Sequence, residues 1–149
     1  MPRTSPRPAV AVLALVAGAC GGGSPTAPRP SPTPTSTPPP TRTVLVARNF
    51  TLGGGATSSD TVDNVPPGVV DVRVEWPGTS DLNLYATDTS CPGVVELLAG
   101  QCRVLAQAVT TARPERIEFT TAAAGNYVYW VRNLGTSSEP VALEVGVTR

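Results

Sequence analysis

The sequence predicts an all-β fold, a single antiparallel β-sandwich over residues 44–149. Seven or eight short segments are rich in β-branched and aromatic residues, and several of them alternate between apolar and polar positions. Turns rich in glycine and proline separate these segments. No long stretch has the spacing of an amphipathic helix, so two packed sheets are the expected way to bury the apolar faces.

Four strands are expected in the first half of the domain. They are Val44–Phe50, an edge strand around Val62 and Val65, Val69–Trp76 and Asp81–Ala86. The alternation is clearest in Val69–Trp76, whose valines alternate with charged residues, and this predicts one buried and one solvent-facing side. Asp81–Ala86 repeats the pattern with Leu82 and Leu84 inward. These two strands are expected to form either a hairpin or a connected pair across the core.

An irregular excursion, Thr87–Gln101, follows these strands and contains an expected helical turn at Val94–Leu98. Cys91 and Cys102 are expected to form a disulfide in an oxidising compartment, where closing a loop of about a dozen residues contributes roughly 3 kcal/mol. Metal ligation is the alternative, but two thiols without a third or fourth donor nearby are a poor ligand set.

Four more strands are expected after this excursion. They are Arg103–Thr111, Arg116–Thr120, Tyr127–Asn133 and Val141–Val147. Ile117 and Phe119 are predicted to point inward, whereas the pattern leaves open which way the first of these strands faces. In the third, the tyrosines and Val131 fit the core face, so Trp130 is expected to point the other way.

Residues 1–19 are predicted to be a secretory signal peptide. Two arginines precede an apolar run at residues 9–17, which is about half of the roughly 20 residues that a membrane-spanning helix needs. The small residues at positions 17–19 lead directly into Cys20 and fit an ordinary secretory cleavage site. They also resemble the lipobox of bacterial lipoproteins, which implies that Cys20 becomes the acylated first residue of the mature chain.

The cysteine count favours the lipoprotein interpretation. Cys20 is the odd one of three cysteines, and acylation leaves no unpaired thiol. Lipoproteins of this kind carry more than one acyl chain, as stable membrane anchoring requires. Gly21 follows the cysteine in place of aspartate. In a Gram-negative lipoprotein this implies the outer membrane, and in another envelope type the outer face of the plasma membrane is expected.

Residues 20–43, from the lipidated cysteine onward, are predicted to be a disordered tether. Positions 21–43 hold eight prolines, six threonines and no acid. Such a segment cannot bury apolar surface and favours extended polyproline II, so it reaches at most about 70 Å. A passive spacer is the expected role. A proline-motif docking ligand and O-linked glycosylation are alternatives that the residues leave open.

Charge and composition exclude several functions. Residues 44–149 carry seven arginines and eleven acids, a net charge of −4, so no nucleic-acid partner is expected. The chain contains no histidine and no lysine. It therefore has no Ser-His-Asp triad, no histidine zinc site, no Walker P-loop and no Schiff-base lysine. A role other than that of an enzyme is expected.

The valine-rich strand ending at Trp76, the segment Asp81–Tyr85 and the segment Gly125–Asn133, followed by a closing alternating strand, resemble the bacterial pre-peptidase C-terminal domain. That family has a "DLDLY" strand and a "GxYxVxV" strand in this order. The resemblance covers about Asp60 to Val147 and implies a jelly-roll-like β-sandwich. Members usually accompany secreted hydrolases, which implies an accessory or binding role here. Asn83 departs from the pattern, as does the cysteine-closed loop.

Oxygen donors on one strand give a weak calcium candidate. Asp81 and Asn83 share one face of their strand, and either Asp88 or the acidic stretch at residues 60–64 could join them. Calcium needs six to eight oxygen ligands, and the sequence has no dense aspartate-glycine loop. The competing interpretation is an ordinary solvated strand face. No other cofactor is expected.

A tryptophan beside a cation gives the candidate ligand-binding site. Trp130 and Arg132 could form an exposed platform that stacks on sugar rings or contacts a partner protein. Alternatively, the Thr87–Gln101 excursion covers Trp130. Trp76 ends the clearest buried run and is expected in the core.

Outward-facing acids offer pairs that could hydrolyse a glycosidic bond, but cross-strand salt bridges explain them better. The acids are Asp71, Glu75, Glu118 and Glu144, and the arginines expected beside them are Arg73, Arg116 and Arg132.

These features predict a lipid-anchored lipoprotein of the cell envelope, outside the cytoplasm, whose β-sandwich is not catalytic. Its expected role is to bind an envelope polymer, a glycan or a protein, while Cys20 attaches it to the membrane. The alternative is a structural or assembly accessory subunit of an envelope complex. A secreted hydrolase is the third and most distant possibility.

Overall fold

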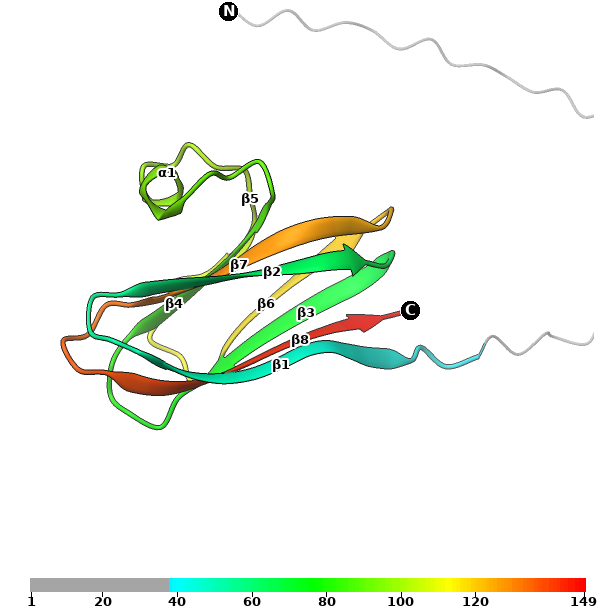
Figure 1. Ribbon diagram of the computed structural model, residues 1–149. Helices are drawn as coiled ribbons and strands as arrows, with labels where there is room; N and C mark the ends of the chain where they lie inside the picture. Colours follow the sequence, from blue (N-terminus) through cyan, green and yellow to red (C-terminus); the bar gives the residue numbers. More distant parts are fainter. Residues whose placement is uncertain (1–37) are drawn as a thin grey trace, which may run out of the picture. The chain divides into compact units, whose positions relative to one another are not determined.

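The computed structural model describes residues 38–149, which form two four-stranded antiparallel sheets packed face to face (Figure 1). This confirms the predicted β-sandwich. The predicted signal peptide, Cys20 and most of the predicted tether lie outside the described residues. Within the described part, no helix is long and apolar enough to cross a membrane.

Eight strands and one short helix make up the domain. They are β1 (Arg42–Leu52), β2 (Thr57–Val65), β3 (Gly68–Glu75), β4 (Leu82–Asp88), α1 (Val94–Leu98), β5 (Val104–Ala108), β6 (Glu115–Thr121), β7 (Gly125–Asn133) and β8 (Glu139–Thr148). One sheet has the order β1-β8-β3-β6 and is called the β8 sheet here; the other has the order β2-β7-β4-β5 and is called the β7 sheet. Every predicted strand is present, and so is the predicted helical turn.

The two strands with the clearest alternation lie in different sheets. β3 pairs with β6 and β8, whereas β4 pairs with β5 and β7. They therefore form a connected pair across the core and not a hairpin. The connection between them, residues 76–81, carries the chain from one sheet to the other.

The core lies between the inner faces of the sheets. Its fully or nearly fully buried members include Val70, Val72, Val74, Leu82, Leu84, Ala86, Ile117, Tyr129, Val131, Val141, Leu143, Val145 and Val147. These are the positions that period-two alternation predicted to face inward. On β5, whose facing the sequence left open, Ala106 and Ala108 pack against this core.

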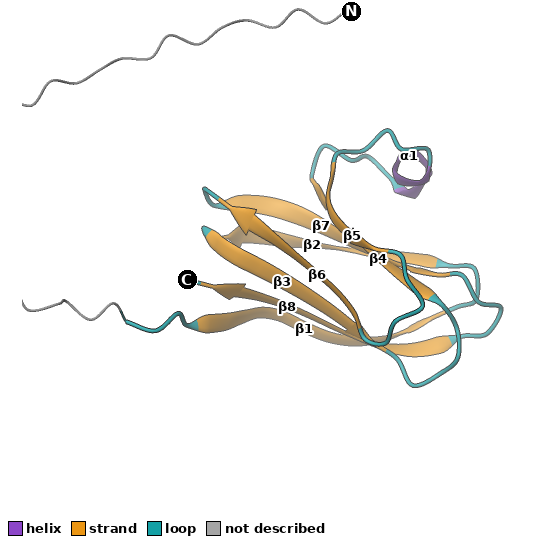
Figure 2. Cartoon of the chain, turned by 180° about the vertical axis from the view of Figure 1, so that it is seen from behind, coloured by secondary structure: helices purple, strands orange, loops and turns teal. Residues whose placement is uncertain are grey.

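The folded domain begins earlier than the sequence predicted. Arg42 and Thr43, which were assigned to the tether, belong to β1. Thr41 and Arg149 exchange two backbone hydrogen bonds, of 2.9 and 3.1 Å. This place, where β1 begins and the chain ends, is called the tether end of the sandwich (Figure 2). The opposite end, with the connections at residues 53–56, 76–81 and 134–138, is called the distal end.

Candidate functional site

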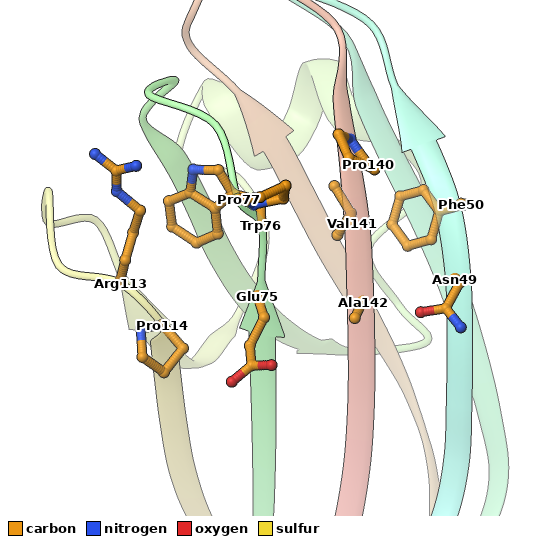
Figure 3. Close-up of a pocket in the computed structure, with 10 residues that line it drawn as sticks. All are labelled: Asn49, Phe50, Glu75, Trp76, Pro77, Arg113, Pro114, Pro140, Val141 and Ala142. Atoms are coloured by element: carbon orange, nitrogen blue, oxygen red, sulfur yellow. The ribbon is translucent and has the colours of Figure 1, made fainter.

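A groove with a volume of about 660 Å³ lies at the distal end of the β8 sheet (Figure 3). Its lining residues come from segments far apart in the sequence. They are Asn49, Phe50, Glu75, Trp76, Pro77, Arg113, Pro114, Pro140, Val141 and Ala142. Two aromatic rings and three prolines make this surface largely apolar, and three polar or charged side chains complete it.

The strand register explains the floor of the groove. Ala142 on β8 is paired with Glu75 on β3 and with Asn49 on β1. All three side chains point away from the core, because their neighbours Leu143 and Val74 point into it. The small Ala142 therefore separates two polar side chains. Figure 3 shows the aromatic rings on either side of β8.

Trp76 forms one wall and is held in a fixed position. Its indole nitrogen donates a 2.7 Å hydrogen bond to the carbonyl oxygen of Ser80, and only 7 % of the residue is exposed. The guanidinium carbon of Arg113 lies 5.9 Å from the centroid of the indole ring, a cation–π contact. Arg113 also donates a hydrogen bond to the carbonyl oxygen of Gly78. The predicted core position of Trp76 is confirmed. The sequence did not predict that Trp76 also lines a groove.

A buried carboxylate supports the connection next to this wall. Glu139 is 4 % exposed, and its Oε1 accepts a 3.2 Å hydrogen bond from the backbone N–H of Ser80. A side chain at Gly78 would collide with this carboxylate. Hydrogen bonding from Ser80 lowers the pKa of Glu139 below its ordinary value of 4.5. Nothing in the sequence around Glu139 indicates this burial.

Glu139 is expected to make the domain sensitive to acid. Because its pKa is lowered in the folded state, its contribution to stability is present above pH 4.5 and is lost as the pH falls through the folded value. The melting temperature of the wild type should therefore fall more between about pH 5 and about pH 3 than that of Glu139→Gln. Glu118→Gln, on the outer face of β6, is the control. Parallel pH profiles for wild type and Glu139→Gln would contradict this role.

The structure corrects the candidate platform at Trp130. The residue is 6 % exposed and packs against Cys91 and Leu97 of the excursion. Its indole nitrogen donates a 3.0 Å hydrogen bond to the hydroxyl of the buried Thr87. Trp130 points away from the main core as predicted, but the excursion covers it. Arg132 is half-buried beside it, and the pair does not form an exposed platform.

A disulfide closes the segment that covers Trp130. Cys91 and Cys102 are bonded, as predicted, with their Cα atoms 5.0 Å apart. The bond holds α1 over the outer face of the β7 sheet. Leu97 faces inward onto Trp130, while Val95 is 72 % exposed and Leu98 is 46 % exposed. The excursion thus covers one aromatic residue and presents two aliphatic ones.

The structure does not bring the calcium candidates together. Asp81 precedes β4 and Asp88 ends it, so about 20 Å of strand separates them. Asp88 accepts a 3.0 Å hydrogen bond from the backbone of Ser90, and Asp60 forms a 2.7 Å ion pair with Arg48. Among the described residues there is no group of three or more His, Cys, Asp or Glu side chains suited to a metal ion. The face carrying Asn83 is also less solvated than expected, since this residue is 8 % exposed.

Within residues 38–149, three of the four outward-facing acids, all but Glu118, form salt bridges, with one unexpected partner. Asp71 and Glu144 both bind Arg42, at 2.6 and 2.7 Å, while Glu75 pairs with Arg73 on its own strand. The cross-strand interpretation is therefore confirmed for Asp71 and Glu144. Their partner was wrongly assigned, because Arg42 had been placed in the tether.

The comparisons with known proteins show similarity in architecture. No protein-family model matches the chain, and no curated protein matches it in sequence. The Yersinia pseudotuberculosis-derived mitogen is a similar solved structure, with a TM-score of 0.52 and 10 % identity over 72 % of this chain and 86 % of the mitogen.

Two further solved structures resemble the chain more weakly. PliG of Aeromonas hydrophila, a periplasmic inhibitor of g-type lysozyme, has a TM-score of 0.45 and 17 % identity, over 74 % of this chain and 86 % of PliG. PirA has a TM-score of 0.42 and 18 % identity, over 69 % of this chain and 93 % of PirA. At 10 % identity the mitogen is comparable with the chain in fold alone. The resemblance to the pre-peptidase C-terminal domain is thus supported only in its fold class, and what the chain shares with the mitogen is a small β-sandwich architecture.

Proposed function

We propose that this chain is a lipid-anchored, non-catalytic binding module of the cell envelope that takes an extended polymer into the groove at the distal end of its sandwich. The position of the groove carries this proposal. Along β1, Arg42 lies at the tether end and Asn49 lies in the groove, seven residues further on. This spacing corresponds to about 20 Å of strand. The groove therefore lies at the end of the sandwich opposite to the one where the predicted tether would join, so attachment there leaves the groove open to a ligand.

The composition of the groove fits a binding site. Its volume of about 660 Å³ lies within the roughly 300–1,000 Å³ of small-ligand pockets. Such sites combine apolar and aromatic walls with a few placed polar groups. Asn49, Glu75 and Arg113 supply those polar groups here.

The same groove is poorly equipped for acid–base catalysis. Glycoside hydrolysis uses two carboxyl groups about 5 to 9.5 Å apart across the scissile bond. Glu75 is the acid that lines the groove, and it is paired with Arg73. The carboxylate of Glu139 is enclosed by Ser80 and Gly78. With no histidine or lysine in the chain, these positions support binding and not turnover.

The Cys91–Cys102 disulfide supports a location outside the cytoplasm, because such bonds persist in oxidising compartments. The lipid anchor rests on the sequence around Cys20. Cys20→Ala is expected to release the protein from the detergent phase of a phase-partition assay into the aqueous phase. The intact mass of the membrane-extracted wild type should correspond to a chain that begins at residue 20 and carries acyl groups. An unmodified thiol at Cys20 in a freely soluble wild type would refute the anchor.

Substitutions in the groove test the binding role. Asn49→Ala and Arg113→Ala are each expected to weaken retention on an insoluble cell-envelope fraction about tenfold, the loss of roughly 1.4 kcal/mol that one good hydrogen bond to a charged or amide group can supply. Gln107→Ala on β5 and Arg103→Ala just before β5, both at exposed positions away from the groove, are the matched controls. If all four variants lost retention equally, or if none of them lost it, the binding surface would lie outside the groove.

The exposed apolar residues of α1 favour one second candidate, a docking surface of an assembly subunit. Val95 and Leu98 stand on a segment that the disulfide holds in place. Val95→Glu would then remove the protein from an isolated envelope complex and leave retention on envelope polymer unchanged. The groove variants would have the opposite pattern.

A further inference from the structure

We infer that the ligand of the groove is an uncharged, hydroxyl-rich polysaccharide and neither a peptide strand nor a polyanion. This inference rests on the proposed function, because it concerns the same groove. Three properties of the groove carry it: the backbone beneath it, the charges along it and the surfaces that line it.

The two central strands beneath the groove have no backbone hydrogen-bonding groups left for a peptide strand. β8 is paired on both sides, with β1 and with β3, and β3 is paired with β6 and with β8. An extended peptide gains affinity by adding a strand to an open sheet edge. The groove instead crosses the face of these strands, so the polar groups that it offers come from side chains.

The charges along the groove oppose each other. Glu75 is the acid among the lining residues and Arg113 is the cation. Glu75 is also paired with Arg73, so neither a polyanion nor a polycation meets a run of opposite charge along the groove. A hydroxyl group can bind both side chains, because it donates a hydrogen bond to the carboxylate of Glu75 and accepts one from the guanidinium of Arg113. The amide of Asn49 likewise offers a donor and an acceptor.

The lining surfaces suit the faces of sugar rings. Phe50 lies on one side of β8, and prolines at positions 77, 114 and 140 extend the apolar surface. Trp76 on the other side is 7 % exposed and packs in the core, so it supports this surface without offering a free ring face. The indole is fixed by Ser80, and proline rings have almost no rotamer freedom to lose, so little conformational entropy is lost on binding. From β1 to the start of β6 the groove crosses three interstrand spacings, about 14 Å. This length suits several linked sugar units.

The test is a binding titration of the purified full chain. The probes are neutral polysaccharides (β-glucan, xylan and mannan), the acidic polysaccharides alginate and polygalacturonate, and a proline-rich peptide. At least one neutral polysaccharide should bind, with affinity changing less than about twofold between about 50 and about 500 mM NaCl, because no net charge is neutralised. Asn49→Ala and Ala142→Leu should each weaken it about tenfold. Ala142 is exposed, so its substitution blocks the floor without disturbing the core.

Each of the other outcomes contradicts either the ligand class inferred for the groove or the proposed function itself. Binding of an acidic polysaccharide that is lost in high salt and in Arg113→Ala would overturn the uncharged class and leave the groove as the site. Peptide binding that Ala142→Leu abolishes would overturn the polysaccharide class. The polysaccharide class would also be overturned if no neutral polysaccharide bound while the protein still bound an envelope fraction through the groove. Retention on the envelope that no groove variant changes would overturn the proposed function itself.

Discussion

Trp130→Ala is expected to lower the free energy of unfolding by about 3–5 kcal/mol, the range measured for large aromatic residues removed from a core. The indole is the centre of the small apolar cluster with Cys91 and Leu97, and its N–H satisfies the hydroxyl of Thr87. Removing it leaves a cavity between the excursion and the β7 sheet. Urea denaturation, followed by circular dichroism, measures the change.

Trp130→Phe is the matched control, because it keeps a ring in the cluster and removes only the indole N–H and part of the volume. Its loss of stability should be smaller, with about 1 kcal/mol attributable to the hydrogen bond. Polymer binding by both folded variants should remain within about twofold of wild type, since the groove lies in the other sheet. If Trp130→Ala kept full stability but no longer bound polymer, Trp130 would belong to an exposed binding platform, as the sequence predicted.

Removing the disulfide with Cys91→Ala and Cys102→Ala together is expected to cost about 3 kcal/mol, because the bond closes a loop between residues 11 apart in sequence. The first consequence should be local. Cleavage by a protease of broad specificity should begin within residues 87–101, while the two sheets, whose core lies elsewhere, stay folded. Cleavage that begins in the sheets would contradict this order of unfolding.

The two losses are expected not to add. Trp130 and the disulfide stabilise the same segment, so Trp130→Ala should cost less in the double-alanine background than in the wild type. Strict additivity would mean that the excursion stays docked without its disulfide. In that case the position of α1 would depend on packing alone.

Several strands could be predicted because a single segment contains the information for them. In β3, valines alternate with charged residues over positions 70–75. In β8, valines and a leucine alternate with small or polar residues over positions 141–148, and in β4 Leu82, Leu84 and Ala86 follow the same pattern over a shorter run. A pleated strand with one buried face requires such a pattern, so the pattern identifies both the strand and its inner side. The disulfide was predictable for a similar reason, since two nearby cysteines had no competing partner.

The groove could not be predicted in this way. Asn49, Trp76 and Arg113 belong to segments separated by dozens of residues, and nothing within any one segment indicates that they meet. They come together because β1, β8, β3 and β6 are neighbours in that order. Glu139 is a similar case, because nothing near it in the sequence indicates that the distant connection at residues 76–81 encloses its carboxylate.

The sequence by itself determined the strands, the inner face of most of them and the disulfide, because each depends on residues close together in the chain. The leader and the tether stay predictions. Only the tertiary structure decided that Trp130 is covered, that Arg42 belongs to the sheet and that a groove forms at the end opposite the tether. These outcomes depend on which strands lie side by side, and strand order is set by packing between distant segments, which local alternation does not encode.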